Sequence, residues 1–129
     1  MTQILLVDDE MTVRETLAAY LEDDGFHILE AGSGEEAVHL LEKGCRPKVC
    51  IMDMRLPGMD GHDAILALHA RMPELRFLIY TGSLSYGLPD DLRAIGMDDA
   101  AVFRKPVQDM RQLADTVRSL MALGANGHA

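Results

Sequence analysis

Short apolar runs that alternate with helical patterns are the feature that most constrains how this chain can fold. Four runs are continuously apolar, which is typical of strands buried on both faces of a parallel sheet. They are Ile4–Val7, Val49–Met52, Phe77–Tyr80 and Ala100–Phe103. A fifth run, Phe26–Ala31, carries His27 and Glu30, so it predicts a more exposed edge strand.

Helical patterns separate the runs, and most carry a start or stop signal. Thr12 and Glu15 predict a capping box at the head of the first helix, and Asp60 predicts the N-cap of a helix that ends before Pro73. The other helices are expected over Glu35–Leu41 before Gly44, Pro89–Ile95 before Gly96, and Val107–Leu123. Five strand–helix alternations predict an α/β fold with a doubly wound parallel sheet and right-handed crossovers.

Composition limits the class of protein. A chain of 129 residues with 48% apolar and 26% charged residues suits one soluble domain. The net charge of −9 argues against direct binding of nucleic acid, which needs clustered Lys and Arg. Neither a signal peptide nor an apolar stretch of about 20 residues is visible, so we expect a cytoplasmic protein that does not insert into membranes. Cys50 lies inside an apolar run and predicts a buried structural thiol.

We expect the domain to cover residues 1–123 and to be followed by a flexible tail over 124–129. The tail is rich in small residues, as in a frayed end or the start of a linker. The sequence leaves open whether the chain stands alone or belongs to a longer protein.

Acidic residues, a threonine and a lysine stand directly after the predicted strands. They are Asp8, Asp9, Glu10, Asp53, Thr81 and Lys105. In open α/β sheets, ligands bind beyond the carboxyl ends of the strands. Carboxylates that converge there repel each other unless a cation joins them, and Mg²⁺ suits a few carboxylates with water. A lysine and a threonine hydroxyl suit phosphate oxygens. The sequence therefore predicts a carboxylate nucleophile that faces a phosphoryl group.

Four motifs in order carry a resemblance to a known family. LLVDDE, IMDMRLPGMDG, YTG at a strand end and FRKP resemble the receiver domains of two-component response regulators, over roughly residues 3–122. The resemblance implies a flavodoxin-like (βα)5 fold, a three-layer sandwich with strand order 2-1-3-4-5. It also implies a signalling domain rather than an enzyme. The implied partners are a sensor histidine kinase or a phosphotransfer domain, and an unknown downstream effector.

The resemblance assigns roles to individual residues. Asp53 would be the phosphoacceptor, Asp9 a direct ligand of Mg²⁺ (or Mn²⁺), and Asp8 the holder of a metal-bound water. The Arg55 carbonyl would complete the metal ligands. The residues implied to bind or support the phosphoryl group are Thr81, Lys105, Met54, Gly82 and Pro106, with a cis Lys105–Pro106 bond.

Two features depart from the family. Receivers usually carry an aromatic residue three positions before the lysine, where this chain has Val102, and Phe103 comes one residue later. Because strand side chains alternate, either a bulge restores the register or the output is not read through an aromatic switch. The interval from Thr81 to Lys105 is also longer than is usual. By resemblance, Arg55 and Ser83 occupy the positions that tune dephosphorylation.

Two other functions use a similar set of residues. A Mg²⁺-dependent phosphatase of the haloacid dehalogenase type needs a second Asp two residues after the nucleophile, and Arg55 stands there. A degenerate receiver would act as a phosphorylation-independent scaffold, but such domains lose residues that this chain keeps. The sequence does not reveal the cognate kinase, the oligomeric state or the lifetime of the phosphorylated form.

Overall fold

The computed structural model describes residues 3–83 and 85–125 of the chain, and it holds a five-stranded parallel sheet. The strand order is β2-β1-β3-β4-β5, which confirms the predicted topology. The strands are β1 (Ile4–Val7), β2 (Ile28–Ala31), β3 (Val49–Asp53), β4 (Arg76–Thr81) and β5 (Val102–Arg104). The predicted edge strand lies at one margin of the sheet, and its first three residues are less buried than those of β1 and β3.

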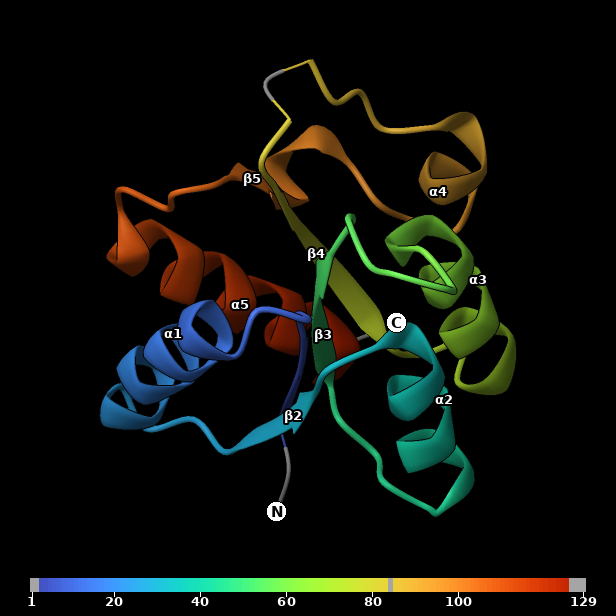
Figure 1. Ribbon diagram of the computed structural model, residues 1–129, viewed down its shortest axis with the longest axis horizontal. Coiled ribbons are helices and arrows are strands. Elements are labelled where there is room, and N and C mark those ends of the chain that lie inside the picture. Colours follow the sequence, from blue (N-terminus) through green and yellow to red (C-terminus); the bar gives the residue numbers. More distant parts are fainter. Residues whose placement is uncertain (1–2, 84, 126–129) are drawn as a thin grey trace.

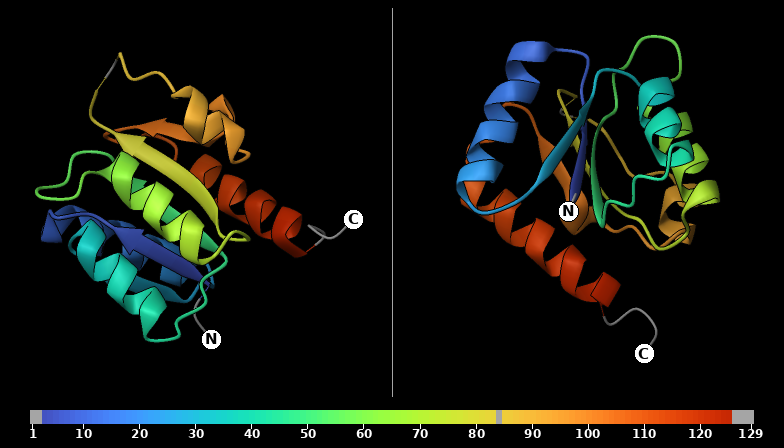
Figure 2. Two further views of the ribbon diagram at one scale, coloured as in Figure 1. Left: turned by 90° about the vertical axis from the view of Figure 1, so that its right-hand side faces the viewer. Right: turned by 90° about the horizontal axis from the view of Figure 1, so that it is seen from below.

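In the part of the chain that the structure describes, five α-helices cover the two faces of the sheet. They are α1 (Met11–Asp23), α2 (Gly34–Glu42), α3 (Gly61–Arg71), α4 (Asp90–Ala94) and α5 (Met110–Ala125). Helices α1 and α5 lie on one face, and α2, α3 and α4 lie on the other (Figures 1 and 2). The result is the three-layer sandwich that the resemblance implied. Among the described residues, none of the helices has the length and apolar character needed to cross a bilayer.

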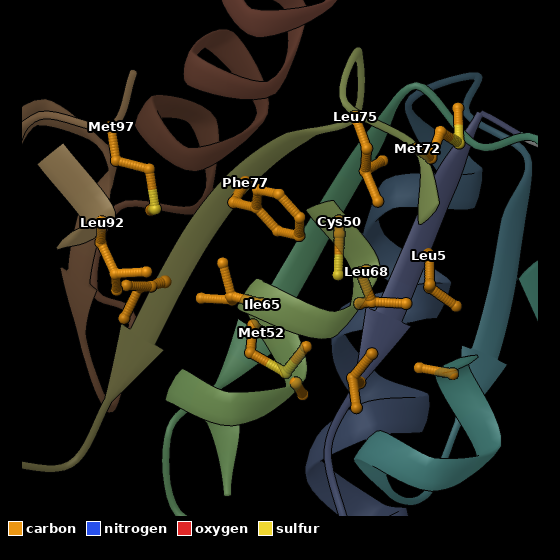
Figure 3. Packing of buried hydrophobic residues seen from close by; sticks show 14 of the residues in the cluster. Leu5, Cys50, Met52, Ile65, Leu68, Met72, Leu75, Phe77, Leu92 and Met97 are labelled. Carbon is orange, nitrogen blue, oxygen red and sulfur yellow. The ribbon is translucent and has the colours of Figure 1, made fainter. Parts of the chain in front are cut away.

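Alternating side chains of the strands build a separate core on each face. Leu5, Cys50 and Phe77 point toward α2, α3 and α4, where they pack with residues such as Leu68 and Leu92 (Figure 3). Their neighbours in sequence point the other way, toward α1 and α5. That second core includes Ile4, Leu6, Ile51, Leu78, Leu17 and Val117. Because both faces are covered, the strands are continuously apolar rather than alternating.

The structure confirms one predicted helix N-cap and contradicts another. Asp60 caps α3 through a hydrogen bond from the Asp63 amide at 2.9 Å, as expected. The capping box at Thr12 is wrong, because α1 already begins at Met11 with Glu10 at its N-cap. The Asp8 carboxylate accepts the Glu10 amide at 2.9 Å, so the chain turns directly after β1 and the helix starts earlier.

Boundaries near the C-terminus also differ from the expectation. The start of the predicted strand Ala100–Phe103 forms a 3-10 helix, η1 (Asp99–Ala101), because the Asp98 side chain accepts the Ala100 amide. Helix α5 begins at Met110 rather than Val107, since the Asp109 carboxylate accepts the Gln112 amide at 3.0 Å. It continues to Ala125, two residues beyond the expected end, and residues 126–129 of the expected tail lie outside the described residues.

Gly61 allows the start of α3 to lie directly against the end of β3. A Cβ atom at this position would lie 2.6 Å from the Asp53 carbonyl oxygen and 2.6 Å from the Met54 Cα. Both are backbone atoms, so the overlap is relieved only by moving the segment that carries Asp53.

We therefore expect Gly61→Ala to lower the free energy of unfolding by about 2 kcal/mol, as overpacking of a tight contact does. Urea unfolding followed by circular dichroism would measure it. Gly87→Ala is the matched control, because a Cβ there would have no heavy atom within 4 Å. Equal stability of the two variants would contradict the close-approach role of Gly61.

Candidate functional site

Three carboxylates converge at the carboxyl ends of β1 and β3. Asp8, Asp9 and Asp53 each offer an oxygen, and these oxygens lie within 4.8 Å of one another. Asp8 and Asp53 are buried, whereas Asp9 is exposed. The structure thus brings together the three acids that the sequence predicted as a cation site.

Strand alternation explains why these groups share one side of the sheet. Leu6 and Ile51 both face α1 and α5. Asp8 comes two residues after Leu6 and Asp53 two residues after Ile51, so the two acids are directed to the same side. Tyr80 packs on the same face and pairs with Asp53 across β3 and β4. Parallel strands therefore deliver two carboxylates and a phenol to one edge.

The Asp8 carboxylate is held through both of its oxygens. Its Oδ1 accepts the Glu10 amide, and its Oδ2 accepts Lys105 Nζ at 3.3 Å. Oδ2 also accepts a hydrogen bond from the Tyr80 hydroxyl. The Asp8 backbone carbonyl accepts Arg14 Nη1 at 2.7 Å. The loop between β1 and α1 is therefore fixed by partners from β4, from α1 and from the segment that follows β5.

Asp53 combines burial with two donors. Its Oδ1 accepts the Arg55 amide at 3.1 Å, and its Oδ2 accepts Lys105 Nζ at 3.1 Å. Burial raises the pKa of Asp53 above its ordinary value, although the Arg55 amide and Lys105 act in the opposite direction. The metal-free carboxylate is therefore held in the site at a cost in free energy.

Lys105 is the cation shared by these acids. Besides Asp8 and Asp53, its Nζ lies 3.9 Å from the Glu10 carboxylate and 4.5 Å from the centroid of the Tyr80 ring. Burial alone would lower the pKa of Lys105, but its hydrogen bond and charge interaction with Asp53, and those with Asp8, outweigh burial and raise it. Lys105 thus carries its positive charge at neutral pH.

Residues after β4 form the next part of the site. Thr81 is buried at the end of the strand, and its hydroxyl oxygen accepts the Ser83 amide at 3.2 Å. Its backbone carbonyl accepts the Lys105 amide at 2.8 Å, which ties the ends of β4 and β5 together. A Cβ atom built at Gly82 would have none of the counted heavy atoms within 4 Å, so there is open space beside this residue.

The remaining predicted residues lie around the acids. The carbonyl of Met54 accepts the Gly61 amide at 3.4 Å, and Met54 packs against the core beneath α2 and α3. Arg55 is exposed, and the Lys105–Pro106 bond is cis, as the resemblance implied.

The pairing of β5 bears on the predicted departure from the family. Val102, Phe103 and Arg104 pair in turn with Ile79, Tyr80 and Thr81, so the register runs through this stretch without a bulge. Val102 therefore packs against the core on the α2–α4 side. Phe103 packs on the opposite side, against the core beneath α1 and α5.

This donor set fits a divalent cation. Three carboxylates converge, Lys105 pairs with the two that are buried, and the cluster therefore carries excess negative charge in a poorly solvated place. Carboxylate oxygens that leave room for water are the ligands Mg²⁺ prefers.

Two residues of the site do not stand out in the sequence. Tyr80 is the last residue of an apolar run, and the one local signal of its role is that a tyrosine hydroxyl in a buried strand needs a polar partner. Arg14, whose Nε also binds Glu30 at 2.9 Å, supports the Asp8 loop. Its role depends on the proximity of β1 and β2, which a local pattern does not reveal.

Comparisons with known proteins agree with this geometry. The family profile of the response regulator receiver domain matches residues 4–118. Sporulation initiation phosphotransferase F of Bacillus subtilis is 27% identical over 124 residues, which cover 96% of this chain and 97% of that protein. The transcriptional activator protein ExaE of Pseudomonas putida is 40% identical over 87 residues, 66% of this chain. The match covers only 40% of that activator's length.

A solved structure shares the architecture as well. It is the response regulator protein TrrA from Thermotoga maritima, in complex with Mg²⁺–BeF. The two are 27% identical, with a TM-score of 0.76, and the match covers 93% of this chain and 99% of that one.

The raised pKa of Asp53 has a consequence for stability. The folded metal-free protein binds a proton at Asp53 more tightly than the unfolded chain does. The free energy of unfolding therefore falls as the pH rises above about 4. The whole of this decrease is present once the pH exceeds the raised pKa of Asp53.

We expect Asp53→Asn to raise the free energy of unfolding in EDTA at neutral pH by about 1 kcal/mol, and Tm by about 4 °C. Lys105 keeps Asp8 as a partner in this variant. Thermal unfolding from pH 4 to pH 8 would measure the difference, which should grow with pH. Asp23→Asn, at an exposed aspartate of α1, is the control. A pH-independent difference would contradict the raised pKa.

Proposed function

This chain belongs to the response regulator receiver domain family, and we propose that it accepts a phosphoryl group on Asp53 in a Mg²⁺-dependent reaction. One observation carries the proposal: Lys105 Nζ bridges Asp53 and Asp8 at the point where three carboxylates converge. The proposed nucleophile, the acids of the proposed cation site and a cationic donor thus lie close together.

Asp8, Asp9 and Asp53 would hold the metal, with the Arg55 carbonyl as a further ligand. Bound Mg²⁺ supplies positive charge that offsets repulsion between the carboxylates and an incoming phosphoryl group. The fit of Mg²⁺ to this site rests on the negative charge of these carboxylates and on their oxygen ligands.

The chain's own residues would perform the transfer. An Asp53 oxygen attacks phosphorus, a new P–O bond forms, and the bond from phosphorus to the donor breaks with its electron pair leaving on the donor. The Arg55 amide orients Asp53 before attack. Lys105 then exchanges its hydrogen bond to Asp53 for one to a phosphoryl oxygen, and the Thr81 hydroxyl donates to another.

We also propose a phosphoryl donor and a cellular location. We assign the donor as the phosphohistidine of a sensor kinase or of a phosphotransfer domain, in the cytoplasm. Family membership supports this assignment, as does the similarity to a protein named a phosphotransferase over nearly its whole length.

We also propose that the conformational output does not use an aromatic switch at position 102. Phe103 faces the core beneath α1 and α5, with Val107 and Met110 in the same cluster. Moving its ring to the α4 side would require a one-residue slip of β5, which would reverse the faces of Val102 and Arg104 as well. The signal would then pass through Thr81 and its backbone link to Lys105.

Incubation with Mg²⁺ and acetyl phosphate tests the proposed reaction. We expect a mass gain of about 80 Da, the mass of one phosphoryl group. The gain should be lost in Asp53→Asn and in EDTA, because both the nucleophile and the metal are needed. Asp63→Asn, on α3 outside the acid cluster, serves as the matched control.

Intact-protein mass spectrometry would measure the result. A gain that persists in Asp53→Asn would place the phosphoryl group on another residue. Absence of any gain in the unmodified protein would favour the scaffold function instead.

The switch proposal has its own test. We expect a crystal structure with Mg²⁺ and beryllofluoride to show Phe103 still packed with Val107 and Met110, because the register of β5 holds the ring there. A ring that has crossed to the α4 side in that structure would overturn the proposal.

A further inference from the structure

A buried tyrosine adjoins the acid site on its α1–α5 side. The Tyr80 hydroxyl donates to Asp8 Oδ2, and Lys105 Nζ lies 4.5 Å from the centre of its ring. We propose that Tyr80 is a positioning residue: its hydroxyl holds Asp8 for metal binding, and its ring holds Lys105 for phosphoryl transfer. The inference about the ring rests on the proposed function, whereas the inference about the hydroxyl concerns metal binding alone.

The hydroxyl is the part that acts on Asp8. Tyr80 is 1% exposed and Asp8 is 0% exposed, so water has little access to either group. A buried carboxylate needs hydrogen-bond donors, and a buried phenol needs an acceptor. Because the Glu10 amide binds Oδ1 and Tyr80 binds Oδ2, the carboxylate cannot rotate without losing a bond.

Partners of this kind orient the carboxylates of a metal site, and their removal costs metal affinity. The hydroxyl is thus expected to act on the metal site without touching the metal.

The ring is the part that acts on Lys105. A lysine side chain is long and flexible, so it needs a support if its ammonium group is to remain between two carboxylates. The face of an aromatic ring attracts such a cation. Asp53 pairs with Tyr80 across β3 and β4, so Tyr80 is the cross-strand neighbour of the acceptor. It can therefore guide Lys105 toward both Asp8 and Asp53.

The surroundings of Tyr80 allow the two parts to be separated by mutation. Its side chain packs in the core beneath α1 and α5, and it also lines an open apolar cavity of about 420 Å³ with Leu17 and Met110. Tyr80→Phe keeps the ring and removes only the hydroxyl. Tyr80→Leu removes both and enlarges an existing cavity rather than creating a clash.

The first experiment measures Mg²⁺ binding by titration calorimetry on the full chain, without a phosphoryl donor. We expect Tyr80→Phe to raise the Kd for Mg²⁺ by about tenfold, as loss of an orienting partner does. Tyr20→Phe, at a tyrosine on the surface of α1, should leave the Kd unchanged. An unchanged Kd in Tyr80→Phe would overturn the role of the hydroxyl.

The second experiment measures the rate of phosphorylation by acetyl phosphate at saturating Mg²⁺. We expect Tyr80→Phe to regain the rate of the unmodified protein, because its ring still supports Lys105. Tyr80→Leu should remain slower by about tenfold, in line with the loss of a cation–π contact. Equal rates for the two variants would overturn the role of the ring.

Circular dichroism in EDTA checks that each variant is folded, and Tyr80→Met replaces the leucine variant if that one is not. The calorimetric result decides on the hydroxyl whether or not the unmodified protein takes up phosphate, so failure of this inference is distinct from failure of the proposed function.

Discussion

The burial of like-charged carboxylates beside a single lysine is the interaction on which the site depends. Asp8 and Asp53 lie almost entirely out of water, and Lys105 is the cation that bridges them among the residues that the structure describes. Burial raises the pKa of Asp53, and the neighbouring charge of Asp8 adds to this effect, so holding both acids in the site is costly without a cation. The surrounding structure offsets that cost in free energy, because the parallel sheet supplies a rigid edge and the cores on its two faces hold the strand ends in place.

The alternation of side chains along the strands connects this edge to the rest of the molecule. Asp8, Asp53 and Tyr80 lie on the side of α1 and α5, while the residues between them in each strand fill the opposite core. The same alternation separates Val102 from Phe103 at β5. One geometric rule thus assembles the acids, places a phenol among them and directs an aromatic ring away from α4.

Much of the fold and site could be predicted because their signals are local. A continuous apolar run marks a doubly covered strand, and the acids directly after β1 and β3 fall at its ligand-binding edge. Helix limits were less predictable. The capping box at Thr12 failed because the Asp8 carboxylate bound the Glu10 amide and started α1 early. That competing bond depends on the conformation of the loop, which the local pattern of residues does not specify.

The sequence by itself determined the α/β class, the strand order through the family resemblance, and the identities of the three acids and Lys105, since each depends on residue type and order along one segment. Only the tertiary structure decided that Tyr80 binds Asp8, that Arg14 supports the Asp8 loop and that β5 pairs without a bulge. These features arise between segments distant in sequence. They depend on which strands are neighbours and in what register, and packing of the whole chain sets both.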